Sequence, residues 1–153
     1  MRVFVFLHVL SMVSAVTVAY GPALLTRRAA HSGSVPAIRT TFGAVRPLGK
    51  WIPILFLVGL GFAIIAIITE GFNPLQPWLL FAYVLFAIGM FNGARFHGPY
   101  AVAVADAADK SPDDAPSPEL RAALDNRGEE ITYWVDFAVI ALILFDMIVK
   151  PFL

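Results

Sequence analysis

Four ionisable side chains lie inside long apolar stretches of this sequence. These residues are His8, Asp136, Asp146 and Lys150. An ionisable group is costly inside a lipid bilayer, so the few that occur there usually bind ligands, transfer protons or pair helices. Each of the four is therefore a candidate functional residue, and the apolar segments around it decide how deep it lies.

Those apolar segments predict four membrane-spanning helices. A hydrocarbon core of about 30 Å needs about 20 apolar residues at about 1.5 Å per residue. Segments at about residues 3–26, 51–69, 75–95 and 131–149 meet this length. Lipid offers no partner to an open backbone, and the runs lack the alternation of barrel strands. We predict an all-α fold, with one integral membrane domain over residues 1–153 built as a four-transmembrane-helix bundle.

The first apolar segment has an alternative interpretation as a secretory signal peptide, because the basic residue Arg2 precedes it. The run is about twice as long as a normal signal-peptide core. It also continues past Ala19-Tyr20-Gly21, the nearest approach to a cleavage site. A membrane span is therefore the favoured interpretation.

The composition agrees with a membrane protein and excludes several other classes. Charged residues make up 14% of the chain and hydrophobic residues 59%, whereas soluble domains carry about 25% charged residues. The formal net charge is zero, so nothing indicates a nucleic-acid partner. The absence of cysteine excludes disulfides, thiolate metal sites and Cys nucleophiles. No nucleotide-binding loop, zinc-protease motif or nucleophile elbow is present, so an enzyme is the less favoured interpretation.

Basic residues predict the orientation of the bundle. All Lys and Arg residues except Arg2 and Lys150 lie in or beside the loops 27–50 and 96–130. The positive-inside rule then places both loops in the cytoplasm and both termini outside. Loop 27–50 is either a topology signal alone or a patch for anionic lipid.

The loop 96–130 is expected to carry helices of its own. Residues 101–110 are rich in alanine, and Ser117-Pro118-Glu119 has the pattern of an N-cap, a first-turn proline and a first-turn acid. A helix from Ser117 is expected to run through Leu124 and on into the fourth span. The acidic residues of this loop form either a solvated face or a docking surface for a partner.

Helix rise sorts the polar residues of the spans into two layers. The outer layer holds His8, Asp146 and Tyr83, and the inner layer holds Tyr20, Asn92 and Asp136. Simpler roles also fit. Asp146 can pair with Lys150 four residues further on, and Asp136 can accept hydrogen bonds that fix the helix register.

His8 is the candidate cofactor ligand. Its alternative role is helix packing, because it begins a stripe with Ser11, Ala15 and Ala19 at helical spacing. His97 is expected at the inner edge of the membrane and His31 in a loop, so a haem on His8 needs a methionine ligand, an open axial position or a second copy of the chain. The candidate methionines are Met12, Met90 and Met147. No metal site is assigned.

Short motifs at both ends resemble a bacterial family of predicted integral membrane proteins of unknown function. The motifs are Phe6-Leu7-His8-Val9-Leu10 and Asp146-Met147-Ile148-Val149-Lys150-Pro151, with a Pro- and Arg-containing segment before the second span. The resemblance implies the bacterial inner membrane. That family is distantly similar to the copper-resistance D-type membrane domains, and this similarity implies His8 as a metal or haem ligand.

Three functional hypotheses follow. The first is an accessory or structural subunit of a larger membrane assembly, supported by the lack of catalytic motifs and by small-residue spacings that suit helix contact or a homodimer. These spacings are Gly59 with Ala63 and Gly89 with Gly93. The second hypothesis is a haem- or metal-binding protein that uses His8. The third is a transporter of protons or small solutes that uses Asp136 and Asp146.

Overall fold

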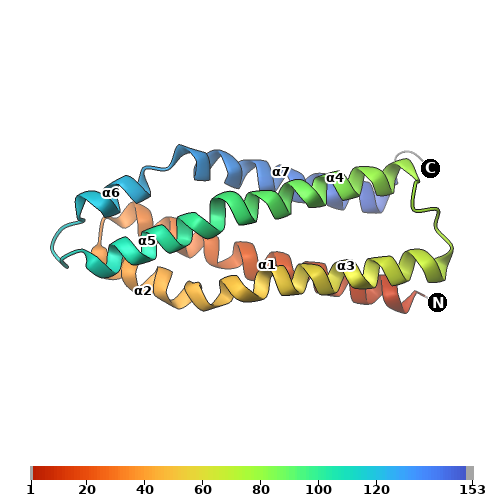
Figure 1. Cartoon of the computed structure of the whole chain (residues 1–153), viewed down its shortest axis with the longest axis horizontal. Coiled ribbons are helices and arrows are strands. Elements are labelled where there is room, and N and C mark those ends of the chain that lie inside the picture. The colour runs from red at the N-terminus through yellow and green to blue at the C-terminus, as the bar shows by residue number, and fades with distance from the viewer. Residues whose placement is uncertain (1, 151–153) are drawn as a thin grey trace.

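Four helical rods run side by side along the length of the molecule (Figure 1). This computed structural model describes residues 2–150. The helices are α1 (Val3–Ser32), α2 (Val35–Val45), the 3-10 helix η1 (Arg46–Lys50), α3 (Trp51–Glu70), α4 (Pro77–Asn92), the π-helix η2 (Gly93–His97), α5 (Gly98–Lys110), α6 (Pro118–Leu124) and α7 (Arg127–Val149). No strand occurs among the described residues, and all four rods are long and apolar enough to cross a membrane. The predicted all-α, four-span fold is confirmed.

The four rods are arranged as two pairs. α1 packs along α3, and α4 packs along α7. The start of α1, the end of α7 and the turn between α3 and α4 lie at one end of the bundle, which we call the terminal end (Figure 1). α2, α5 and α6 lie at the opposite end, which we call the loop end. The pairing leaves space between the α1–α3 pair and the α4–α7 pair.

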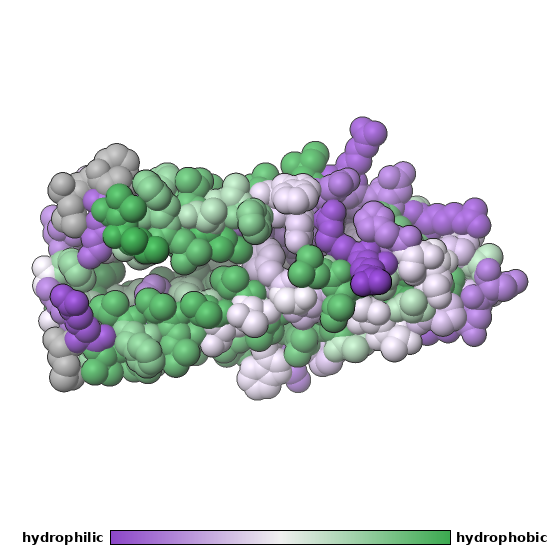
Figure 2. Space-filling model, turned by 180° about the vertical axis from the view of Figure 1, so that it is seen from behind, coloured by the Kyte–Doolittle hydropathy of each residue, from purple (hydrophilic) through white to green (hydrophobic). Residues whose placement is uncertain are grey.

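The two ends of the molecule differ in polarity. In Figure 2, apolar side chains cover the half that includes the terminal end, and hydrophilic ones gather at the loop end. The apolar half keeps large side chains on its outer surface, including Ile68 at 72% and Ile148 at 79% exposure. Such a surface is stable only against lipid, because water would make it costly.

The loop end has a small hydrophobic core of its own. Its buried members come from α1, α2, α5 and α6: Ala29, Val35, Ile38, Phe42, Val104, Ala105, Ala108 and Leu120. Arg39 fixes the end of α5, where its guanidinium donates to the carbonyls of Ala108 and Ser111 and to the Asp113 carboxylate at 3.1, 2.7 and 2.7 Å. These contacts satisfy carbonyls that a helix end leaves without partners.

The loop 27–50 that we expected between the first two spans is helical. α1 continues to Ser32, and α2 and η1 fill most of the remainder. The reason lies in the spacing of Val35, Ile38 and Phe42, which puts three buried side chains on one face of α2. A count of charges along the chain does not reveal this face.

The loop 96–130 forms two short helices. The predicted N-cap is confirmed, because the Ser117 side chain accepts a hydrogen bond from the backbone N–H of Leu120. The expected continuation into the fourth span is wrong. α6 ends at Leu124, and the Asn126 side chain caps a new helix by accepting from the backbone N–H of Glu129.

Candidate functional site

The Asp136 carboxylate is the centre of a buried polar cluster between three helical rods. Its side chain on α7 is almost fully buried, with a residue exposure of 1%. The Asn92 amide on α4 donates to its Oδ1 at 2.6 Å, and the Tyr20 hydroxyl on α1 donates to its Oδ2 at 2.9 Å. The structure thus brings together the three residues that helix rise assigned to one layer. Each Asp136 oxygen thus accepts from a donor on another helical rod.

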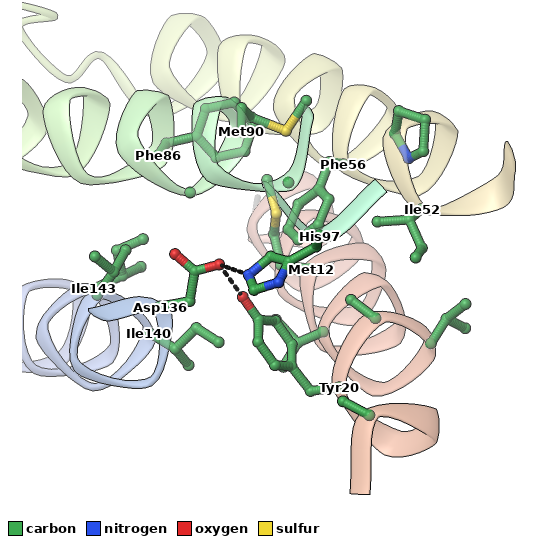
Figure 3. A pocket seen from close by; sticks show the side chains of 18 of the residues that line it. Met12, Tyr20, Ile52, Phe56, Phe86, Met90, His97, Asp136, Ile140 and Ile143 are labelled. Atoms are coloured by element: carbon green, nitrogen blue, oxygen red, sulfur yellow. Dashed lines mark hydrogen bonds and ion pairs between the residues drawn. The ribbon is translucent and has the colours of Figure 1, made fainter. Parts of the chain in front are cut away.

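His97 completes the cluster, and sequence reasoning placed it only at the edge of the membrane. Its Nε2 lies 2.9 Å from Asp136 Oδ2, and its Nδ1 lies 2.7 Å from Glu129 Oε1 (Figure 3 shows the Asp136 contact). Glu129 stands in the first turn of α7, two turns before Asp136. Both ring nitrogens of His97 therefore face a carboxylate.

A π-helix positions His97. η2 covers Gly93–His97, between α4 and α5, and Gly98-Pro99 follow at once. Proline has no N–H to donate and its ring crowds the preceding turn, so a widened turn accommodates it within a continuous rod. Gly98 also sits close to the backbone, because a Cβ there would lie 3.2 Å from the Gly93 carbonyl oxygen. The Gly-Pro pair beside a histidine was the sequence signal for this feature.

A crevice of about 1830 Å³ separates the two helix pairs and reaches the polar cluster. Its wall between the pairs is mainly apolar, with these side chains labelled in Figure 3: Met12, Phe56, Phe86, Met90, Ile140 and Ile143. Tyr20, His97 and Asp136 line it as well. A slot between the two helix pairs is visible in the apolar half of the molecule (Figure 2). Apolar walls with a few convergent polar groups are typical of small-molecule sites.

His8 lines the same crevice, nearer the terminal end. Its Nδ1 donates to the Gly59 carbonyl oxygen at 2.8 Å, because a carbonyl can only accept. That bond leaves Nε2 as the ring nitrogen with a free lone pair in the neutral imidazole. The α1–α3 contact is close here, since a Cβ on Gly59 would lie 2.9 Å from Met12 Cε. His8 thus takes part in helix packing and keeps one nitrogen available to a ligand.

Asp146 and Lys150 do not form the local pair considered from their spacing. No ion pair joins them among the described residues, and neither oxygen of the fully buried Asp146 has a hydrogen-bond partner there. The Lys150 ammonium instead lies 4.9 Å from the ring centroids of both Phe72 and Trp78. Lys150 lines the crevice, whereas Asp146 is not among its lining residues. Among the described residues no hydrogen bond connects Asp146 to His8 or Tyr83, so the residues expected in the outer layer do not form a cluster as those of the inner layer do.

The arrangement favours organic ligands and protons over a bare metal ion. Within residues 2–150, no group of three His, Asp or Glu side chains is arranged to hold a metal. The His97 nitrogens are already engaged with two carboxylates, and Asp136 accepts three hydrogen bonds. What the cluster offers is a set of hydrogen-bonded groups that hold and exchange protons at the wall of an apolar crevice.

The fold and the buried cluster define a four-span α-helical integral membrane protein. The chain belongs to the family described as predicted integral membrane protein (DUF2269), which matches residues 2–151. No curated protein and no solved structure matches the chain.

Proposed function

We propose that this protein binds one lipid-soluble molecule in the crevice between its two helix pairs. The observation that carries the proposal is the crevice itself: about 1830 Å³ of space beside apolar side chains, with a polar cluster in its wall. Ligand sites commonly occupy about 300–1,000 Å³. The crevice is larger than this range, so it has room for a molecule with a long apolar part. Its polar head group lies against Tyr20 and His97, which line the wall of the crevice.

A matched pair of glycine variants tests this proposal. Gly89 lines the crevice and Gly61 does not, and a Cβ at either position meets open space. In Gly89→Leu the new side chain fills part of the crevice, whereas in Gly61→Leu it leaves the crevice unchanged. Both variants replace a helical glycine by the same good helix former, so their effects on helix propensity are matched.

The measurement is native mass spectrometry of each protein after gentle extraction from its own membrane, with solvent extraction to identify bound molecules. We expect additional mass on the wild-type protein and on Gly61→Leu, and its loss from Gly89→Leu. A wild-type protein that carries no additional molecule contradicts the proposal. Equal occupancy in the two variants does so as well, because it places the molecule outside the crevice.

A haem is a second candidate occupant, favoured by the geometry of His8. A histidine that ligates a metal usually donates its other ring nitrogen to a carbonyl or carboxylate, and His8 Nδ1 donates to Gly59 in this way. His8 Nε2 would hold the iron of a haem in the crevice, and Met12, one turn further along α1, would pack beside it. An absorption spectrum with a haem band that disappears in His8→Ala supports this candidate. A colourless wild-type preparation from the native membrane refutes it.

Membership in a larger assembly stays a prediction, as do the bacterial inner membrane and the orientation. The same mass spectra test the accessory-subunit hypothesis, because a partner polypeptide or a second copy of the chain adds its own mass. The absence of cysteine allows a clean labelling test of orientation. We expect Asp114→Cys, at the loop end, to react only from the cytoplasm, and Asn73→Cys, in the turn between α3 and α4, to react only from outside. The opposite labelling pattern means that the bundle has the opposite orientation in the membrane.

A further inference from the structure

The polar cluster forms a continuous chain of hydrogen bonds along the wall of the crevice, from Glu129 near the loop end to Tyr20, and all four of its members line the crevice. Glu129 Oε1 contacts His97 Nδ1 at 2.7 Å, and His97 Nε2 contacts Asp136 Oδ2 at 2.9 Å. The same Asp136 oxygen accepts from the Tyr20 hydroxyl at 2.9 Å. Each link has the length of a normal hydrogen bond, so no gap interrupts the chain.

The number of protons in this chain is not fixed by its contacts. A neutral imidazole has one N–H, yet both nitrogens of His97 face carboxylate oxygens. Both contacts are hydrogen bonds only if one additional proton is present, either on the imidazole or on one of the two carboxyl groups. Glu129, His97 and Asp136 therefore share a proton that has three alternative positions.

The chain is more exposed at Glu129 and His97 than at Asp136. The Asp136 side chain is 2% exposed, while the side chains of Glu129 and His97 are 17% and 26% exposed. Glu129 follows the exposed residues 125–127 at the N-terminus of α7. At the other end, Tyr20 lines the crevice. A purely structural ion pair needs only one partner for each charge. This chain instead joins four groups that can each accept and release a proton.

We infer that Glu129, His97, Asp136 and Tyr20 form a proton relay between the loop end and the molecule in the crevice. The inference rests on the proposed function, since it names the head group of that molecule as one that takes up and releases a proton, such as a phenol or an enol. Asn92 is a positioning residue, because its amide holds Asp136 Oδ1 at 2.6 Å and leaves Oδ2 to the relay.

One proton moves in each passage. Glu129 takes a proton from water and passes it to His97 Nδ1, while His97 releases its Nε2 proton to Asp136. The Tyr20 hydroxyl, which donates to Asp136 in the structure, turns to the anionic head group, gives up its proton there and regains a proton from Asp136. The head group gains one proton and the water loses one, so the four side chains keep their charges. His97 returns to its starting tautomer when its remaining proton moves from Nδ1 back to Nε2. Passage in the opposite direction releases a proton from the head group.

The shared proton is tested first, in a way that does not require the bound molecule. The chain has three histidines, so ¹⁵N-histidine labelling gives few ring signals, and His97→Gln identifies those of His97. We expect both ring nitrogens to show the shifts of protonated or hydrogen-bonded nitrogen, and Glu129→Gln to change the Nδ1 signal. A wild-type spectrum with one bare, unbonded ring nitrogen overturns the relay.

Proton transfer is tested with an alkyl-chain hydroxycoumarin bound to the full chain in nanodiscs. Energy transfer from tryptophan reports how much of this phenolic indicator is bound, and a pH jump in a stopped-flow instrument reports how fast it exchanges its proton. We expect His97→Gln and Glu129→Gln to slow the exchange of the bound indicator by about 100-fold, as for the loss of a positioned proton-transfer group. We expect Glu129→Gln to do so without changing the bound fraction, because the head group lies against Tyr20 and His97. Glu129→Gln keeps the shape of the side chain, which guards against a folding defect.

Glu130→Gln is the matched control, because Glu130 is the next residue and is also acidic. It lies outside the chain, 3.9 Å from Arg27, with its side chain 67% exposed. We expect the wild-type exchange rate in this variant. Equal rates in Glu129→Gln and the wild type overturn the relay even where the indicator binds. Failure of the indicator to bind contradicts the proposed function for phenolic molecules, and the ¹⁵N spectra still decide the relay.

Discussion

Replacement of Asp136 by leucine removes the common acceptor of donors on two other helical rods, Tyr20 on α1 and Asn92 and His97 on the rod of α4, η2 and α5. Leucine has the same number and branching of side-chain heavy atoms as aspartate but no polar atom, so the substitution removes the acceptor. Asn92 is 7% exposed and loses its acceptor inside the bundle. Tyr20 and His97 lose theirs at the crevice wall. A buried donor without an acceptor costs the desolvation free energy of that group.

The size of this effect follows from the number of bonds and from their membrane setting. Hydrogen bonds between membrane helices contribute about 0.6 kcal/mol on average and about 1.7 kcal/mol at most. Three bonds to one buried carboxylate therefore predict a loss of about 2 to 5 kcal/mol in the free energy of unfolding for Asp136→Leu. For Asn92→Leu, which removes the shortest of the three, we expect a loss of about 1 to 2 kcal/mol.

A double-mutant cycle separates the bond from other effects of the two substitutions. The assay is equilibrium unfolding in mixed micelles with increasing SDS, followed by circular dichroism and tryptophan fluorescence. In the Asp136→Leu background the Asn92 amide already lacks its acceptor. We therefore expect Asn92→Leu to be neutral or stabilising there, in contrast to its cost in the wild type.

The reasoning is refuted if the two substitutions are additive within about 0.5 kcal/mol, the usual limit for independent sites. Additivity means that the amide and the carboxylate do not interact in the folded protein, despite the 2.6 Å between their atoms. A loss below about 1 kcal/mol for Asp136→Leu refutes the joint role of the three donors.

Three further substitutions test the loop end and its caps by the same unfolding assay. Ile38→Ala should lower the free energy of unfolding by about 2–5 kcal/mol, because Ile38 is fully buried in the loop-end core. Ile68→Ala is the lipid-facing control, since Ile68 is 72% exposed. Equal losses in the two variants contradict the stabilising role of the loop-end core. Arg39→Lys should lower the free energy of unfolding by about 1–2 kcal/mol, because an ammonium cannot reproduce the guanidinium contacts with two carbonyls and a carboxylate. An unchanged stability means that these contacts contribute little. Ser117→Ala should cost about 1 kcal/mol through loss of the α6 cap, and Ser117→Asp, which can also cap, should restore most of it; no rescue contradicts the capping role.

The amino-acid sequence by itself determined the class of fold. Apolar runs long enough to cross a bilayer allow little besides a helix, because every backbone group must find its partner within the segment. The cap at Ser117 was readable for a similar reason, since a capping side chain acts on a backbone group only three residues away. Both features depend on neighbours along the chain.

Helix rise also estimated depth well enough to assign Tyr20, Asn92 and Asp136 to one layer, and the structure brings these three together. The same estimate gave no warning that Asp146 lies away from the crevice while His8 lines it. Depth depends on the number of residues along one helix, whereas direction depends on how each helix is rotated against its neighbours.

Only the tertiary structure decided the membership of His97 and Glu129 in the cluster. A π-helix before Gly98-Pro99 directs His97 towards α7. The helix break at Asp125 and Asn126 makes α7 begin at Arg127, which places Glu129 in its first turn. Helix rotation, register and the crevice between the pairs all arise from side chains that pack across helices, far apart in sequence. A pattern read along one chain contains the lengths of the helices but not the contacts that orient them.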